Sequence, residues 1–85
     1  MSDTRQQIED ILRERFSPQR LEVQDDSGRH VGHAGAGGGG HYRVVLVAAC
    51  FAGLSLVEQQ RRVYEALRPL FPHAIHALAL QTSHA

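Results

Sequence analysis

Three histidines lie close together in the stretch of residues 27–41: His30, His33 and His41. Imidazole is a common metal ligand, so several histidines on one segment predict a site that can hold a metal ion. A structural zinc site needs four nitrogen or sulfur ligands at tight spacing, and His30-x-x-His33 supplies only two. His76, in the last apolar segment, adds a third only if that segment lies beside this stretch. The pattern therefore indicates an incomplete site, open to ligands from another molecule.

The same stretch holds seven of the eight glycines of the chain, four of them consecutive at residues 37–40. Glycine is costly to order and is a poor former of helix or strand. We therefore expect residues 27–41 to form a flexible loop whose histidines can adjust to an ion. The alternatives are a solvated hairpin connection with incidental histidines and, for His76, a hydrogen-bonded histidine at a strand end. We interpret His41, which begins the next predicted strand, as structural.

Nucleotide binding and hydrolysis are not favoured by the sequence. A phosphate-binding loop needs glycines followed by lysine and serine or threonine at the head of a helix, whereas these glycines run into His41 and a strand. A hydrolytic triad needs a nucleophile with histidine and carboxylate partners, and nothing in the spacing of Cys50, Ser55 and Asp25 selects them. We interpret Cys50, at the end of an apolar segment, as a small buried hydrophobic residue.

Every basic residue of the chain is arginine, and three of them suggest a modest nucleic-acid patch on the second predicted helix. These are Arg61, Arg62 and Arg68. Glu58 and Glu65 dilute the positive charge, and the segment lacks interleaved aromatic residues. A solvated helix face is the alternative interpretation.

Composition limits the possible partners. Nine basic and nine acidic residues give zero net charge, so the overall field neither steers the chain to nucleic acid nor repels it. No apolar run approaches the ~20 residues of a membrane helix, and the N-terminal residues lack the apolar segment of a secretory signal. A single cysteine, Cys50, excludes an internal disulfide. We expect residues 1–85 to form one cytoplasmic domain, with no membrane and no small-molecule substrate as partner.

Two helices are predicted from the spacing of apolar residues. Residues 4–7 fit a capping box, and the helix should stop near Phe16 because Pro18 disfavours a helical conformation in the residue before it. The second helix should begin at Ser55 with another capping box and should end or kink at Pro69. Its predicted apolar stripe consists of Leu56, Val63, Leu67 and Leu70.

Three strands complete the prediction. Residues 21–24 alternate apolar and polar side chains, and residues 42–48 are β-branched and almost continuously apolar, as is typical of a central or helix-packed strand. Their closeness in sequence favours an antiparallel pair. Residues 75–80 form the last strand, in which alternation places His76 on the same face as the two leucines that follow it. The order predicts an α+β fold with both helices packed on one face of a three-stranded sheet.

The chain resembles the BolA family over nearly its whole length. The motifs that carry the resemblance are Leu21-Glu22-Val23, Asp25-Asp26-Ser27, His30-Val31-Gly32-His33, His41-Tyr42-Arg43-Val44, Phe51-x-Gly53-x-Ser55-Leu56-Val57, Val63-Tyr64-Glu65-Ala66-Leu67 and Ile75-His76-Ala77-Leu78-Ala79-Leu80. Each motif alone is weak, but their order and spacing together are specific. The resemblance implies a class II KH-like fold of α-β-β-α-β order and a non-enzymatic role.

The resemblance also implies a role in iron–sulfur cluster assembly or trafficking. Members of the family look like partners of monothiol CGFS glutaredoxins, with which they form heterodimers that bridge a [2Fe-2S] cluster. The glutaredoxin cysteine and a glutathione thiolate would hold one side of the cluster. His76 and a loop histidine, matched best by His30 with His33 as an alternate, would hold the other side.

A second role implied by the resemblance is DNA-binding transcriptional regulation of stress and morphology responses, through a helix-turn-helix-like region that matches residues 51–67. The chain departs from the family pattern here, because it reads Gln59-Gln60-Arg61 where the family usually has Arg-His-Arg. We expect this change to remove a positive charge and an imidazole from the face proposed for DNA and partner contact.

Overall fold

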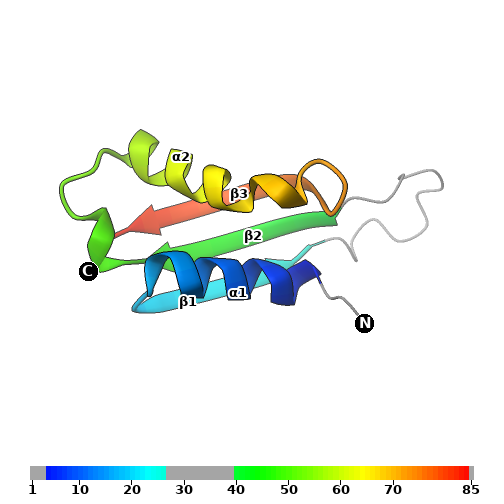
Figure 1. Ribbon diagram of the computed structural model, residues 1–85, viewed down its shortest axis with the longest axis horizontal. Coiled ribbons are helices and arrows are strands. Elements are labelled where there is room, and N and C mark those ends of the chain that lie inside the picture. Colours follow the sequence, from blue (N-terminus) through cyan, green and yellow to red (C-terminus); the bar gives the residue numbers. More distant parts are fainter. Residues whose placement is uncertain (1–3, 27–39, 85) are drawn as a thin grey trace.

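The computed structural model describes residues 4–26 and 40–84. In chain order the elements are α1 Thr4–Phe16, β1 Arg20–Asp25, β2 Gly40–Val47, the 3-10 turn η2 Ala49–Phe51, α2 Leu56–Leu67, the 3-10 turn η3 Arg68–Leu70 and β3 Ile75–Ser83 (Figure 1). The predicted order of helices and strands is confirmed. All three strands exceed their predicted lengths: β1 runs from Arg20 to Asp25, β2 already begins at Gly40, within the predicted loop, and β3 continues to Ser83.

The sheet has the strand order β1-β2-β3, so β2 is the central strand, as expected. β1 pairs with β2 in antiparallel fashion, from Arg20 opposite Val47 to Asp25 opposite Tyr42. β3 pairs with the other edge of β2 in parallel. A parallel pair needs a long crossover connection, and α2 lies in that connection. The result brings the start of β3 beside the start of β2.

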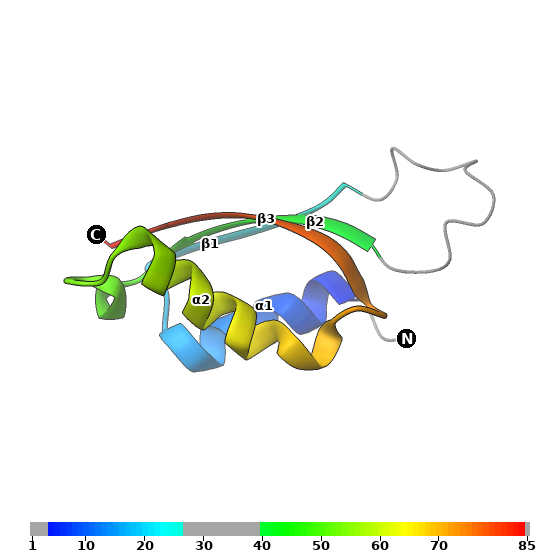
Figure 2. The same cartoon turned by 90° about the horizontal axis from the view of Figure 1, so that it is seen from above.

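Both helices lie on one face of the sheet, and the opposite face carries no helix (Figure 2). Along β2 the side chains alternate between these two faces, with Tyr42, Val44 and Leu46 buried under the helices. The core combines these residues with side chains from α1, α2, η2 and the neighbouring strands. Its fully buried large side chains are Phe51, Ile8, Leu12, Leu46, Leu67, Ile75, Val44 and Val63.

α1 ends at Phe16, as Pro18 predicted, and the chain leaves the helix through an unusual backbone conformation at Ser17. Ser17 has a φ of 45°, the left-handed region that non-glycine residues rarely occupy. Its N–H donates to the Arg13 carbonyl at 3.1 Å, so a helix-terminal acceptor is satisfied. Ser17 therefore acts as a C-terminal cap without glycine's conformational freedom.

α2 begins after the predicted cap, because the Ser55 hydroxyl accepts a hydrogen bond from the Glu58 N–H at 3.1 Å. It gives way to η3, which contains Pro69, at the predicted break. The predicted stripe was wrong at its start, since Leu56 is 57% exposed. The buried face consists of Gln59, Val63, Ala66 and Leu67, and Leu56 lies in the first turn, ahead of it.

Within residues 4–26 and 40–84, no helix has the length and apolar character needed to span a bilayer.

Candidate functional site

His76 is the second residue of β3, and its side chain is exposed. The other two predicted metal ligands, His30 and His33, lie outside the described residues, as does most of the predicted loop. Their ligand roles therefore stay predictions.

An irregularity in the strand pairing decides where His76 points. Gly40 of β2 pairs with Ile75 and the next residue, His41, pairs with Ala77, so one step along β2 spans two steps along β3. His76 is the extra residue of this bulge. Bulges re-aim side chains, and here the alternation slips by one residue. Ile75 is fully buried and the leucines after the bulge pack against the core, whereas His76 is exposed. The prediction that His76 shares a face with Leu78 and Leu80 was therefore wrong.

His41 lies next to His76. The centroids of the two imidazole rings are 5.7 Å apart, and the ring planes are tilted by 33°. His41 precedes the buried Tyr42 on β2, so its side chain belongs to the sheet face that carries no helix. From the sequence, His41 was interpreted as structural because it begins a predicted strand, where the sheet sets the direction of its side chain. Only the parallel register of β2 and β3 brings the two rings together.

Paired imidazoles are nitrogen donors for zinc, copper, nickel and iron. They also fit one iron of a [2Fe-2S] cluster, because two histidines can replace two cysteines on one of its irons. Among the described residues, no group of three or more histidine, cysteine, aspartate or glutamate side chains could hold a metal ion. An ion or cluster beside His41 and His76 would thus take its remaining ligands from residues 27–39, from solvent or from another molecule.

The arginines proposed for nucleic acid lie at the exposed surface of α2 and η3, each with a glutamate partner. Arg61 and Arg62 lie 3.6 and 3.4 Å from the Glu58 carboxylate, and Arg68 lies 3.9 Å from that of Glu65. The side chains of the three arginines are 54–80% exposed. The predicted dilution of positive charge by these two glutamates is confirmed.

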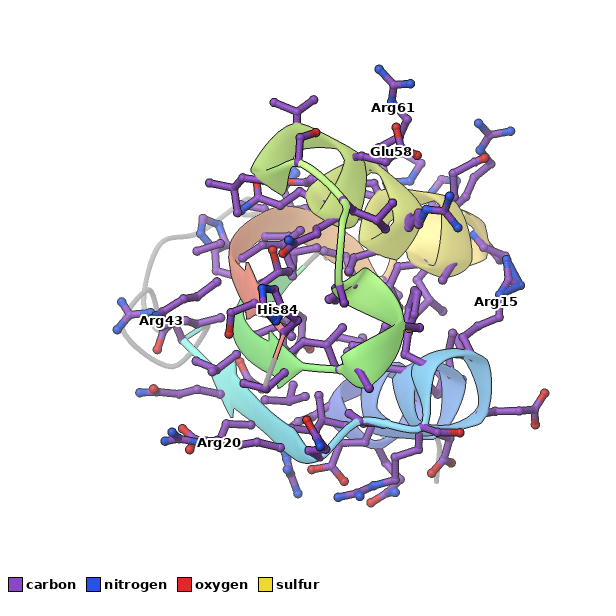
Figure 3. The ribbon with its side chains drawn as sticks, turned by 90° about the vertical axis from the view of Figure 1, so that its left-hand side faces the viewer. Arg15, Arg20, Arg43, Glu58, Arg61 and His84 are labelled. Carbon is purple, nitrogen blue, oxygen red and sulfur yellow. The ribbon has the colours of Figure 1, made fainter. Side chains whose placement is uncertain are left out.

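A cleft of about 460 Å³ lies between the end of α1, η2 and α2. Three arginines and two glutamates line it together with an aromatic ring and a thiol: Arg15, Arg61, Arg62, Glu58, Glu65, Phe16 and Cys50. Arg15 faces the helix side of the molecule, whereas Arg20 and Arg43 project from the strands on the opposite side (Figure 3). Arg15 has no ion-pair partner among the described residues. Sequence reasoning missed this arginine, because it lies far from the second helix along the chain.

Cys50 is exposed, so its interpretation as a buried hydrophobic residue was wrong. It lies in η2, where the next residue, Phe51, turns into the core and is fully buried. The Cys50 thiol points instead toward the end of α1, with its Sγ 3.8 Å from the Phe16 carbonyl oxygen.

A second opening lies further along α2 and combines arginines with aromatic rings. Its lining includes Arg61, Arg68, Tyr64 and Phe71. The rings of Tyr64 and Phe71 have centroids 5.9 Å apart. Tyr64 lies between Arg62 and Arg68 along the chain, so the predicted lack of interleaved aromatic residues was wrong, and the turn after η3 adds Phe71 to this surface.

Gln59 and Gln60, where the chain departs from the family pattern, pack against neighbouring backbone and do not form the exposed face that was expected. Gln59 is 6% exposed and donates a hydrogen bond to the Leu54 carbonyl at 3.0 Å. Gln60 donates to the Leu80 carbonyl at 3.4 Å. These two side chains therefore support the packing of α2 against its preceding turn and against β3, and Gln59 takes no part in an exposed face.

Comparison with known proteins gives one consistent result. The family model described as "BolA-like protein" matches residues 12–85. The chain is 41% identical over 78 residues to a protein of Escherichia coli named "DNA-binding transcriptional regulator BolA", covering 92% of this chain and 72% of that one. It is 39% identical over 70 residues to "BolA-like protein 1" of Mus musculus, covering 82% of this chain and 50% of the relative.

Solved structures agree with the sequence relatives. BolA1 from Arabidopsis thaliana superimposes with a TM-score of 0.86 at 29% identity, covering 99% of this chain and 94% of that one. The BolA domain of SufE1 from the same plant gives a TM-score of 0.82 at 30% identity, with the same coverage. The predicted fold is confirmed, and this chain belongs to the BolA family.

Proposed function

We propose that this protein is an adaptor for iron–sulfur cluster assembly or trafficking, which forms a heterodimer with a monothiol CGFS glutaredoxin around a shared [2Fe-2S] cluster. The observation that carries the proposal is the exposed His76 at a β-bulge, with a second imidazole 5.7 Å away. An exposed histidine backed by a rigid strand can meet a group that another protein presents. Membership of the BolA family supports the same role.

In this proposal the chain supplies half of the ligands. His76 binds the cluster from β3, and a histidine from residues 27–39, His30 or alternatively His33, binds it from the loop. The cysteine of the glutaredoxin and the thiolate of glutathione bind the other iron. Histidine ligation raises the reduction potential of a [2Fe-2S] cluster relative to ligation by thiolates alone. The strand position of His76 lets the adaptor orient its partner, while the loop histidine completes the half-site.

Mixing experiments test this proposal. Cluster-loaded monothiol glutaredoxin, titrated with the protein, should change its visible circular dichroism spectrum, because the ligands and asymmetry around the cluster change. Gel filtration should show a heterodimer that carries the visible absorbance. A glutaredoxin whose CGFS cysteine is replaced by serine serves as the control and should give neither signal. If the cluster-loaded partner gives no spectral change and no heterodimer, the adaptor function is wrong.

A second candidate function is DNA binding, favoured by the cleft at which Arg15 joins Arg61 and Arg62. The E. coli relative is named a DNA-binding transcriptional regulator, and the arginine surface of α2 would be the contact region. Against strong binding, Glu58 lies within 3.6 Å of both Arg61 and Arg62. A filter-binding or anisotropy titration with a defined promoter duplex tests it. Sub-micromolar affinity that falls steeply with salt and is lost in Arg61→Ala would favour DNA binding over the adaptor function.

A further inference from the structure

We infer that His41 and His76 form a two-imidazole site that binds a divalent transition-metal ion on the isolated chain, with Cu²⁺ and Zn²⁺ as the best-suited ions. The two rings come from neighbouring strands and lie 5.7 Å apart between centroids. This inference goes beyond the proposed function, because it requires neither a glutaredoxin nor an iron–sulfur cluster. It also assigns a ligand role to His41.

Hydrogen bonds on both sides fix the backbone that carries His41. The Gly40 N–H donates to the Ala74 carbonyl at 3.0 Å, and the Asp26 N–H donates to the His41 carbonyl at 2.8 Å. These bonds tie the start of β2 to the residue before β3 and to the residue after β1. Sites built on strands hold their geometry better than sites built on loops. A bound ion would therefore need to order only the two side chains.

The observed separation suits two ligands of one ion. Imidazole nitrogens lie about 2.0–2.1 Å from zinc, so two of them on one ion are roughly 3–4 Å apart. Rings with centroids 5.7 Å apart can reach that spacing by side-chain rotation, without movement of the strands. His76 is exposed and His41 is half-buried, so an ion can reach the pair from solvent. Among the first-row divalent ions, Cu²⁺ should bind such nitrogen donors most tightly.

The positive charge nearest to His41 along β2 has an acidic partner. The nearest arginine along β2 is Arg43, which lies on the same face of the sheet as His41. Its guanidinium lies 3.4 Å from the carboxylate of Asp26. The backbone N–H of Asp26 donates a hydrogen bond to the His41 carbonyl. The Asp26 carboxylate therefore offsets part of the positive charge of Arg43, which reduces the repulsion of an incoming ion.

The loop histidines must be removed from the test, because they are also potential ligands. We therefore start from the full chain with His30→Ala and His33→Ala combined, and titrate it with Cu²⁺ and separately with Zn²⁺ in a calorimeter. This double variant should bind one ion. Adding either His41→Ala or His76→Ala should weaken binding about tenfold or more, because loss of even a supporting partner of a metal ligand costs about 10–100-fold. Adding His73→Ala or His84→Ala, the matched controls, should leave the affinity unchanged.

Electron paramagnetic resonance of the Cu²⁺-bound double variant gives a second readout. It should show coupling to two imidazole nitrogens, and to one after either replacement. Loss of all binding in the double variant, or unchanged affinity in its His41→Ala derivative, overturns the inference. His41→Gln, which keeps a side chain of similar size, replaces the alanine variant if far-ultraviolet circular dichroism shows that β2 is disturbed. A failed metal titration leaves heterodimer formation with the glutaredoxin untouched, and the reverse also holds, so the two ideas can fail separately.

Discussion

The imidazole rings of His41 and His76 lie 5.7 Å apart between centroids, although the two residues belong to different strands separated by the whole of α2. The parallel pairing of β2 with β3 creates this contact, and the bulge at His76 exposes its side chain. The end of the sheet where β2 and β3 begin thus carries two imidazole rings. β1 finishes at this same end, so residues 27–39 connect two strands there.

The ligands of the shared cluster should differ in importance. His76→Ala should shorten the lifetime of the bridged cluster most, because its strand position is fixed. His30→Ala should come next and His33→Ala last, since His33 is further along the chain from β1 and is expected to cost more conformational entropy to order. Absorbance decay in the three single variants and the His30/His33 double variant measures this order.

The same series tests the choice of loop ligand. His33 should partly replace His30, so the double variant should lose more lifetime than His30→Ala alone. If His33→Ala proves as damaging as His76→Ala while His30→Ala has no effect, His33 and not His30 is the loop ligand.

Two valines of α2 provide a matched test of which face of the helix is buried. Val63 is fully buried, whereas Val57 is 69% exposed. Val63→Ala should lower the free energy of unfolding by about 2 kcal/mol, from two buried carbons at about 0.8 kcal/mol each plus a cavity term. Val57→Ala should change it by less than about 0.5 kcal/mol. Urea denaturation compares them, and equal losses would contradict the orientation of α2.

The strained backbone of Ser17 predicts a stabilising substitution. Its φ of 45° is unfavourable for a residue with a Cβ atom, so Ser17→Gly should stabilise the protein by about 0.5–1 kcal/mol. Ser55→Gly is the control, because Ser55 has a φ of −65° and caps α2. That change should cost a few tenths of a kcal/mol, roughly the difference between serine and glycine caps. Thermal unfolding measures both, and a lower Tm for Ser17→Gly would refute the strain.

The arginine cleft predicts how DNA affinity should respond to salt. Each phosphate contact contributes about −0.9 to the slope of log affinity against log salt concentration. Arg15→Ala and Arg61→Ala should each make this slope about one unit shallower if the cleft binds phosphates. Arg20→Ala, on the opposite side of the molecule and paired with Glu22, is the control and should leave the slope unchanged (Figure 3). If all three variants behave alike, the cleft is not the contact surface.

Local sequence signals predicted the elements well, because caps and prolines act within a few residues. Ser55, Pro18 and Pro69 placed the helix ends, and the apolar run in residues 42–48 identified the central strand. The same local logic failed at Leu56, which has the spacing of a core residue but lies in the exposed first turn of α2. It also failed at Cys50, because a 3-10 turn sends the following Phe51 into the core instead.

The candidate site was less predictable, because it depends on contacts distant in sequence. Alternation along the last strand placed His76 on the wrong face of the sheet. The bulge that changes its direction arises from the pairing of β3 with β2, which one strand's sequence does not show. His41 gave no signal, because only the register places it beside His76, and Arg15 reaches the arginine cleft through helix packing. His30 and His33 stay predictions from sequence.

Pulsed electron paramagnetic resonance of the reduced, bridged cluster tests the adaptor role most directly. The spectrum of the heterodimer with wild-type protein should show strong coupling to an imidazole nitrogen of His76. That coupling should disappear in His76→Ala and persist in His73→Ala, which removes the neighbouring histidine before β3. If the nitrogen coupling is the same with and without His76, this residue does not bind the cluster, and the account of the site is wrong.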